Sequence, residues 1–474
     1  MFDKQKISPL YTDLYQLTMA KAYFMNQKAD TTACFDYFFR KTPFSGGYLV
    51  FAGLQELLEL IAELRFEKND IDFLHKSGFE SDFLDYLSSF QFNGDIHSVQ
   101  EGDVVFPFEP ILRVEGSLIE TQLIETLLLN VLNFQSLIAT KASRIRHIAK
   151  NKILSDFGLR RAQSYGGIMA SKAALVGGFN STSNVFAARK YNIPSAGTMA
   201  HSYIECFKTE LEAFRAYAKV FPESCILLVD TYNTLRKGIP NAITVAKELE
   251  KKGYKLKGIR LDSGDLAYLS KRARKMLNDE GLDYVKIAVS NQLDEYVIKS
   301  LLEQNAPVDI FGVGTSLITG SPDGAVDGVY KLAEAGETPK LKISENIQKI
   351  TLPGKKQIVR YYNGYGQFYG DAIAMVGEKT PNKMYHPFEK NKSVNLERLK
   401  AELLTKPVMK KGKIINETQD IKNINEYLTN RLNLLPEEHK RFDFPHIYKV
   451  GISHELMDLR DNIISKYTAN DNSK

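Results

Sequence analysis

The sequence predicts an α/β protein built around an irregular, TIM-like parallel β/α barrel of about seven strands. Two observations carry this prediction. Short apolar runs alternate with longer helix-like stretches between residues 146 and 335, at a spacing of roughly twenty to thirty residues. Most of these runs also end in a polar residue or a glycine, as expected where the carboxyl ends of parallel strands form one functional face.

Seven runs are interpreted as strands because each is short, apolar and closed by a turn signal. In chain order they are ILSDFG at 153–158, ALVGGF at 174–179, IPSAG at 193–197, CILLVD at 225–230, LKGIRLD at 256–262, YVKIAVS at 284–290 and VDIFGVG at 308–314. Six of their ends lie at Asp156, Asn180, Asp230, Asp262, Asn291 and Gly314. One polar strand end is equally typical of an ordinary loop, but six that agree favour a shared site.

Two further regions flank this core. A chain of 474 residues exceeds the size at which one hydrophobic core keeps growing, so two or three domains are expected. Residues 1–145 mix strand-like and helix-like segments, which indicates an N-terminal α/β domain. Residues 336–474 predict a C-terminal region that packs back on that domain, and the final polar string TANDNSK predicts disorder.

Composition argues against several classes of protein. The hydrophobic fraction of 43% and the charged fraction of 25% are ordinary for a soluble protein. The net charge of +5 is too small to indicate a nucleic-acid partner but suits anionic small molecules. The N-terminus lacks a secretory signal, and the most apolar stretch, 118–134, contains Glu120, Gln122 and Glu125. Neither export nor a membrane span is therefore expected.

The cysteines and histidines indicate neither a disulfide framework nor a structural metal site. Cys34, Cys206 and Cys225 are odd in number and widely spaced, which fits a reducing cytoplasm. The eight histidines show no metal-ligand spacing. A cytoplasmic location follows as the expectation.

The run FGVGTSLITG at 311–320 predicts a phosphate-binding turn. Gly312 and Gly314 end the seventh predicted strand, and Thr315 begins a helix-like segment. Backbone amides without side chains, a hydroxyl and a helix N-terminus together suit a phosphate. The run matches neither the dinucleotide fingerprint GxGxxG nor the Walker sequence GxxxxGK[ST]. A purely structural turn is the alternative, and the position at a strand end favours phosphate.

A second run, GIRLDSGDL at 258–266, brings Arg260, Asp262 and Asp265 to one strand end. Alternation along a strand places Arg260 and Asp262 on the same face. An arginine offers a forked cation to a carboxylate, whereas aspartates hold sugar hydroxyls or hydrated magnesium. A simple Arg–Asp salt bridge at the strand end is the alternative.

A third polar pocket is indicated by ILSDFGLRRAQ at 153–163 together with GFNSTSNV at 178–185. Phe157 next to Arg160 suits a flat anionic ring and a phosphate, although a core position is the simpler interpretation of an isolated phenylalanine. Ser183 lies among four hydroxyl or amide side chains that crowd one turn. The two runs together describe an anion-binding surface.

His201 follows the third predicted strand in GTMAHSYIE at 197–205. A histidine at such a place can carry a proton, or it can take a phosphoryl group on a ring nitrogen. An isolated histidine near a strand end is more often a structural hydrogen-bonding group. The phosphate-binding runs around His201 favour a functional role.

Six strings together resemble the nicotinate phosphoribosyltransferase family of the type II phosphoribosyltransferases. They are YTDLYQLTMA at 11–20, FFRKTPFSGGYLVFAG at 38–53, SDFGLRRAQ at 155–163, GTMAHSYIE, GIRLDSGDL and FGVGTSLITG. They occur in order over about the first 330 residues, while the tail resembles the family less distinctly.

The resemblance implies an ATP-dependent, ligase-type enzyme of NAD salvage. Such an enzyme condenses nicotinate with phosphoribosyl pyrophosphate to nicotinate mononucleotide and pyrophosphate. ATP is the co-substrate and Mg²⁺ the cofactor, with ADP and phosphate as further products. The family fold is an irregular barrel with an N-terminal domain, in a homodimer with shared active sites, and no membrane or nucleic acid takes part.

The resemblance also assigns roles to individual residues. Tyr15 matches the aromatic that a neighbouring subunit lays on the pyridine ring, and Phe157 matches the opposite face. Arg260 and Thr198 match nicotinate-binding positions, and His201 matches the phosphohistidine, a catalytic role shared with Asp262. The positions that match the sugar-phosphate and diphosphate site are Arg160, Asp230, Asp262, Asp265, Gly312, Gly314 and Thr315, with Asp262 and Asp265 as the candidate magnesium ligands.

Several alternatives remain at this point. Nicotinamide phosphoribosyltransferase shares the barrel and the histidine, but it has an acidic residue where this chain has Ser183 in the nicotinate-binding turn, which favours the acid substrate. Quinolinate phosphoribosyltransferase is shorter and uses no ATP, and type I phosphoribosyltransferases carry a paired-acid loop that this chain lacks. A metal-dependent barrel hydrolase using Asp230, Asp262 and Asp265, or a catalytically silent interaction protein, explains fewer of the runs.

Overall fold

The chain forms two compact units in a computed structural model that describes residues 7–344, 349–389, 391–415 and 417–471. The first unit comprises Met1–Thr140 and Ala325–Lys474, and the second comprises Lys141–Gly324. The chain passes from the first unit to the second within helix α6, Glu125–Ala149.

A parallel six-stranded sheet forms the centre of the second unit, and this confirms the parallel sheet expected from the sequence. Its strand order is β7-β6-β11-β10-β9-β8, and every adjacent pair is parallel. The strands are β6 (Ile153–Asp156), β7 (Ser181–Thr182), β8 (Ile226–Leu228), β9 (Gly258–Leu261), β10 (Lys286–Ser290) and β11 (Ile310–Val313). They are short, apolar and almost wholly buried, as strands covered on both faces are.

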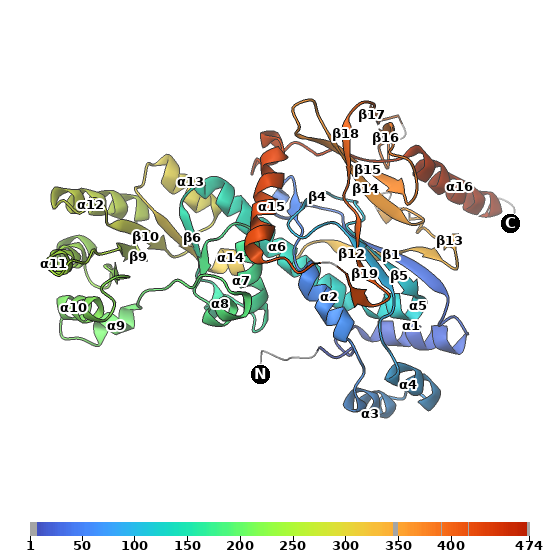
Figure 1. The fold of residues 1–474 in the computed structure, drawn as a ribbon, viewed down its shortest axis with the longest axis horizontal. Helices are drawn as coiled ribbons and strands as arrows, with labels where there is room; N and C mark the ends of the chain where they lie inside the picture. Colours follow the sequence, from blue (N-terminus) through green and yellow to red (C-terminus); the bar gives the residue numbers. More distant parts are fainter. Residues whose placement is uncertain (1–6, 345–348, 390, 416, 472–474) are drawn as a thin grey trace. The chain divides into compact units, whose positions relative to one another are not determined.

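Helices connect these strands; α12 packs against β9 and β10, and α11 packs against α12 (Figure 1). The helices of the second unit are α7 (Gly166–Val176), α8 (Val185–Tyr191), α9 (His201–Glu205), α10 (Glu210–Val220), α11 (Ile239–Glu250), α12 (Leu266–Asp279), α13 (Glu295–Glu303) and α14 (Thr315–Ile318). Two tighter turns, at Leu159–Arg161 and Thr234–Gly238, complete the unit.

Two of the seven expected strands are wrong. The run ALVGGF at 174–179 begins inside helix α7, because its alanine-rich sequence MASKAALV favours a helix and is buried on all sides. The strand at this place is the two-residue β7, which follows the run. The run IPSAG at 193–197 contributes only a single bridge, between Thr182 and Ser195.

The expected closed barrel is likewise not formed by the strand pairing. Strands β7 and β8 lie at opposite edges of the sheet, and no ladder joins them within the residues that the structure describes. The third expected strand, which would lie between these edges, is reduced to one bridge in the described residues and so does not connect β7 to β8. The sheet is therefore open on the side of the segment that leads to His201.

The first unit contains one seven-stranded and one six-stranded sheet, both mainly antiparallel. The seven-stranded sheet has the order β13-β12-β1-β5-β3-β19-β20, and the six-stranded sheet has the order β17-β16-β21-β15-β14-β18. Strands β2 and β4 form a separate pair. Strand β12 falls inside the core range predicted from the sequence, but its antiparallel ladder with β1 joins it to the first unit.

The strands of the first unit come from both ends of the chain. The N-terminal strands are β1 (Thr32–Phe39), β2 (Leu49–Val50), β3 (Asp95–Ser98), β4 (Val104–Val105) and β5 (Leu112–Ser117). The C-terminal strands are β12 (Gly328–Ala335), β13 (Thr338–Pro339), β14 (Lys356–Tyr362), β15 (Phe368–Met375), β16 (Lys383–Tyr385), β17 (Ser393–Asn395), β18 (Lys400–Leu403), β19 (Lys406–Lys410), β20 (Lys413–Ile414) and β21 (Val450–Ile452). The remaining helices are α1 (Leu14–Met25), α2 (Leu54–Glu63), α3 (Lys68–Lys76), α4 (Ser81–Ser88), α5 (Leu118–Leu123), α15 (Ile421–Leu434) and α16 (His454–Asp471).

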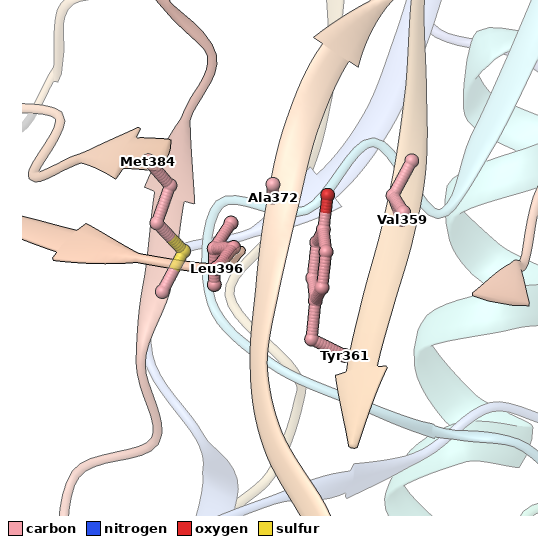
Figure 2. Packing of buried hydrophobic residues seen from close by; sticks show 5 residues of the cluster. All are labelled: Val359, Tyr361, Ala372, Met384 and Leu396. Carbon is pink, nitrogen blue, oxygen red and sulfur yellow. The ribbon is translucent and has the colours of Figure 1, made fainter. Parts of the chain in front are cut away.

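The six-stranded sheet of the first unit carries a compact apolar cluster (Figure 2). Val359 and Tyr361 alternate along β14, and Ala372 lies on the neighbouring strand β15. Met384 and Leu396 complete the cluster from the segments around β16 and β17. The buried hydroxyl of Tyr361 donates a hydrogen bond to the carbonyl of Pro381 at 2.6 Å, so its burial leaves no polar group unsatisfied.

The C-terminal helix and the most apolar helical stretch can both be compared with what the sequence predicts. Helix α16 extends to Asp471, through the first four residues of the string expected to be disordered, while residues 472–474 lie outside the described residues. The helical stretch Leu118–Ala149 is long and apolar enough to cross a membrane by length and composition alone. Because 67% of its most apolar window is buried inside the protein, it also fits a core helix.

Candidate functional site

The candidate site lies at the carboxyl ends of the parallel strands of the second unit. His201 is the first residue of α9, and Asp230 follows β8. Arg260 is on β9, with Asp262 immediately after it. Parallel strands expose their carboxyl ends along one edge, which explains why residues far apart in the chain meet here.

His201 and Asp230 form the central contact of this site. His201 Nε2 lies 3.1 Å from Asp230 Oδ1. The Asp230 side chain is 1% exposed, whereas the His201 side chain is 37% exposed. When Nε2 donates the hydrogen bond to the carboxylate, the lone pair of the ring resides on Nδ1. The arrangement thus offers an accessible, oriented nucleophile.

The second oxygen of Asp230 is held by the turn that follows β9. Asp230 Oδ2 accepts hydrogen bonds from the backbone N–H of Asp262 and from the hydroxyl of Ser263, both at 2.7 Å. Sequence reasoning did not assign a role to Ser263, although it stands inside the recognised run DSGD. Asp262 in turn accepts a hydrogen bond from the hydroxyl of Ser290 at the end of β10.

Arg260 presents a partly unsatisfied guanidinium group to the site. Its Nη1 donates a hydrogen bond to Thr198 Oγ1. Its Nε is buried and has no hydrogen-bond partner within the described parts of the chain. Burial lowers the pKa of Arg260, the Asp262 and Asp230 carboxylates oppose this effect, and the neighbouring Arg160 adds to it. A bound anion would satisfy the free donor and relieve the repulsion between the two guanidinium groups.

Asp265 has a structural role in addition to the one expected. It is the N-cap of α12, and its Oδ1 accepts a hydrogen bond from the backbone N–H of Tyr268 at 3.0 Å. Gly264 before it has a φ of +77°, which a glycine adopts without strain. The second carboxylate oxygen stays available because Asp265 is exposed. Among the described residues, no three His, Cys, Asp or Glu side chains converge as a protein-only metal site.

The ring of Phe157 packs directly against Gly312. A Cβ atom at position 312 would lie 2.4 Å from Cε2 of the Phe157 ring. The backbone N–H of Phe157 donates to the carbonyl of Val313 at 2.8 Å and so fixes the start of this loop on β11. Gly312 therefore has a packing role under the aromatic ring, and its contact with a phosphate stays a prediction.

Asp156 connects the loop that begins at Phe157 to helix α7 and strand β7 by hydrogen bonds. Its fully buried carboxylate accepts hydrogen bonds from the backbone N–H of Gly158, from Ser171 Oγ and from Thr182 Oγ1. Burial raises the pKa of Asp156, and these hydrogen bonds oppose the shift. The backbone N–H of Ser183 donates to the carbonyl of Asp156 at 2.8 Å. The strand-end position was the only sequence signal for this positioning residue.

Arg160 and Thr315 lie on adjacent turns. Arg160 belongs to the turn Leu159–Arg161, which packs against α14. Gly314 precedes α14, and Thr315 is its first residue and is exposed. Helix α14 is a single turn, so its dipole adds little. A cation and a hydroxyl thus belong to two turns that pack against each other, and phosphate binding there stays a prediction.

Tyr15 belongs to the other unit. It lies on α1 and is 50% exposed. The remaining candidate residues all belong to the second unit. Burial raises the pKa of Tyr15, and the charge of Glu125 adds to the shift.

The first unit also contains a cation-lined groove of about 970 Å³ that sequence reasoning did not single out. Arg40, Lys41, Lys392 and Lys449 line it, and no carboxylate belongs to its described lining. Arg40 Nε is buried without a hydrogen-bond partner in the described part of the chain. The adjacent Arg and Lys in the run FFRKTPFSGG were the available sequence signal.

Three family models match successive parts of the chain. The nicotinate phosphoribosyltransferase (NAPRTase) N-terminal domain matches residues 10–133, and the nicotinate phosphoribosyltransferase (NAPRTase) family matches residues 153–364. The nicotinate phosphoribosyltransferase C-terminal domain matches residues 355–460, where the resemblance read from the sequence is less distinct.

Similar proteins cover nearly the whole chain. Nicotinate phosphoribosyltransferase of Bacillus subtilis (strain 168) is 42% identical over 457 residues, which is 94% of this chain and 93% of that protein. The enzyme of the same name from Dictyostelium discoideum is 38% identical and covers 96% of this chain and 88% of its own length. The crystal structure of human nicotinic acid phosphoribosyltransferase aligns with a TM-score of 0.86 at 30% identity, covering 95% of this chain and 99% of that one.

Proposed function

The chain belongs to the nicotinate phosphoribosyltransferase family, and we propose that it couples its reaction to ATP through a phosphohistidine at His201. The reaction of the family joins nicotinate to phosphoribosyl pyrophosphate. The observation that carries the proposal is the contact of His201 Nε2 with the buried carboxylate of Asp230 at 3.1 Å.

The nicotinate carboxylate binds Arg260 in this proposal. The free Nε and the fork of the guanidinium group match the two oxygens of a carboxylate. Thr198 holds the guanidinium group in place from the other side. Phe157 stacks on one face of the ring, with Ser183 on the neighbouring turn, and Tyr15 of a partner subunit stacks on the other face.

The sugar substrate binds beside the pyridine. Its 5′-phosphate lies on the turn formed by Gly314 and Thr315, with Arg160 as the nearby cation. The exposed carboxylate of Asp265 and the partly exposed carboxylate of Asp262 would hold Mg²⁺ together with water and the diphosphate, a set of oxygen ligands that suits this ion. When bound there, the ion would supply positive charge to the departing diphosphate.

Bond formation itself requires no general base. The pyridine nitrogen attacks the anomeric carbon with its lone pair, and the bond from that carbon to the diphosphate oxygen breaks. Arg260 holds the ring in line, while carboxylates near the ribose stabilise the oxocarbenium-like state. The protein therefore contributes mainly positioning and charge.

His201 serves the energy coupling. The bond between the γ-phosphorus of ATP and its bridging oxygen breaks, a bond from phosphorus to Nδ1 of His201 forms, and ADP leaves. Asp230 stabilises the positive charge that develops on the imidazole ring. The phosphohistidine raises the affinity for the sugar substrate, and its hydrolysis after bond formation releases phosphate.

A homodimer completes the site in this proposal. Tyr15 is half exposed on α1 and is available to a second subunit. The cation-lined groove of the first unit offers positive charge to a polyanion such as a diphosphate. Light scattering during gel filtration checks for the dimer, and Tyr15→Ala should raise the KM for nicotinate without unfolding either unit.

The decisive assay follows nicotinate mononucleotide from nicotinate, phosphoribosyl pyrophosphate and Mg²⁺, with and without ATP. ATP should increase turnover, and radiolabelled γ-phosphate should appear on the wild-type protein but not on His201→Ala. An enzyme with His201→Ala that keeps full ATP stimulation would contradict the coupling role.

Nicotinamide is the competing substrate. Arg260 favours the acid, because the carboxylate of nicotinate would accept charge-assisted hydrogen bonds from the guanidinium group, whereas a neutral amide would accept weaker ones. Competition between the two pyridines in one reaction measures the preference directly, and equal use of both would contradict this assignment.

A further inference from the structure

The hydroxyl of Ser263 holds the carboxylate on which His201 depends. Ser263 Oγ donates to Asp230 Oδ2 at 2.7 Å, and Asp230 Oδ1 contacts His201 Nε2 at 3.1 Å. One carboxylate thus links a serine from the β9–α12 turn to the histidine at the start of α9. From this geometry we propose that Ser263 is a positioning residue for phosphorylation of His201.

Two features make the position of this hydroxyl well determined. The backbone N–H of Asp262 binds the same oxygen, Asp230 Oδ2, at 2.7 Å. At the other end of the turn, Asp265 caps α12, and Gly264 with a φ of +77° connects the two anchors. Ser263 is therefore held between fixed points, although its residue is exposed.

The Ser263 hydroxyl affects Asp230 through orientation. With both hydrogen bonds present, rotation of the carboxyl group about χ2 is opposed, so Oδ1 stays directed at His201. Without the hydroxyl only the backbone donor remains, and one donor opposes this rotation less than two. A second carboxylate adds to the need for such a restraint. Glu210 is buried, lies close enough for Asp230 to raise its pKa, and has one oxygen without a hydrogen-bond partner in the described residues.

This inference rests on the proposed phosphohistidine, and it separates Ser263 from the bond-forming step. Ser263 contacts Asp230 and is not assigned to nicotinate or the sugar phosphate. Its loss should slow phosphoryl transfer to His201 while the KM values for nicotinate and for ATP change little. A general disturbance of the site would instead raise the KM values together.

The test compares Ser263→Ala, Ser263→Thr and the control Ser202→Ala in the full-length enzyme. Ser202 is an exposed serine next to His201 and has no role in the site described above. We expect Ser263→Ala to form labelled phosphohistidine about tenfold more slowly than wild type, with unchanged ATP KM. Threonine, which keeps the hydroxyl, should restore most of the rate, and Ser202→Ala should match wild type.

The outcomes are distinguishable. If the wild-type enzyme takes no label from ATP, the phosphohistidine proposal fails and this inference fails with it. If the wild type is labelled and Ser263→Ala is labelled at the same rate, only the role of Ser263 is overturned. A slow Ser263→Ala that threonine does not rescue, or a raised KM for every substrate, also overturns it. Thermal unfolding of each variant shows whether the fold is intact.

Discussion

Arg260 on β9 donates a hydrogen bond from Nη1 to Oγ1 of Thr198, which stands 62 residues earlier in the chain. This contact joins the loop that leads to His201 to β9, the neighbour of the edge strand β8 in the parallel sheet. It also leaves the buried Nε of Arg260 without a partner in the described residues. The guanidinium group is thus fixed on one side and unsatisfied on the other, as a binding group for an external anion should be.

Replacing Arg260 with lysine should weaken nicotinate binding. Lysine keeps the positive charge but loses the planar fork, so one of two charge-assisted hydrogen bonds is lost. We expect the KM for nicotinate to rise roughly 10- to 100-fold, corresponding to about 1.5–3 kcal/mol. Steady-state kinetics with varied nicotinate measures the change. Arg215→Lys, at a surface pair with Glu248, is the matched control and should behave as wild type.

Asp230→Asn should separate energy coupling from bond formation. An asparagine preserves the size of the side chain but turns one acceptor into a donor, which opposes the hydrogen bond from Nε2 of His201. The rate of His201 phosphorylation is expected to fall about 10- to 100-fold. Turnover without ATP should fall less. Equal losses with and without ATP would show that Asp230 acts mainly in bond formation.

Gly312→Ala should displace the ring of Phe157. Because the new Cβ would lie 2.4 Å from Cε2 of that ring, the phenylalanine or the strand must shift. Overpacking of this kind costs about 1–3 kcal/mol of unfolding free energy. A misplaced ring should also raise the KM for nicotinate. Urea unfolding and kinetics test both effects, with Gly324→Ala as the control, since no atom lies within 4 Å of its added Cβ.

Asp156→Asn should change the pH dependence of stability. Burial raises the pKa of Asp156 above its ordinary value of 3.8. The folded state therefore binds this proton more tightly than the unfolded state, and the stabilisation is lost as the pH rises through the folded-state pKa. The free energy of unfolding of wild type minus that of Asp156→Asn should thus fall as the pH rises above about 4, the ordinary pKa of an aspartate. A difference that rises over this range would contradict the assigned direction.

Local sequence patterns located much of the second unit. Five of the seven apolar runs form strands, because β-branched and aliphatic residues between turn signals have few alternatives in a buried sheet. The failure at ALVGGF has a clear cause: a short, wholly apolar, alanine-rich run lacks the periodicity that separates a buried helix from a buried strand. Whether the sheet closes depends on pairing between segments that are distant in sequence, and local sequence patterns do not predict such pairing.

The candidate site was predicted in part for the same reason. His201, Arg260, Thr198, Asp230 and Asp262 were all identified from strand ends and motifs, and the structure places them side by side. The sequence did not identify three features of the site: the capping role of Asp265, the packing of Phe157 against Gly312 and the hydrogen bonds to Asp156. Each of these depends on the distance to an atom that is remote in sequence or on the exact path of a turn.

The sequence by itself determined the family, the parallel arrangement of the core and the chemical identity of the site residues, since motifs and apolar periodicity are local properties. Only the tertiary structure decided that Asp230 is shared by His201, Asp262 and Ser263, and that β12 leaves the core to pair with β1. The physical reason is that hydrogen-bond partners and strand neighbours are selected by packing in three dimensions. Residue spacing along the chain limits those choices but does not make them.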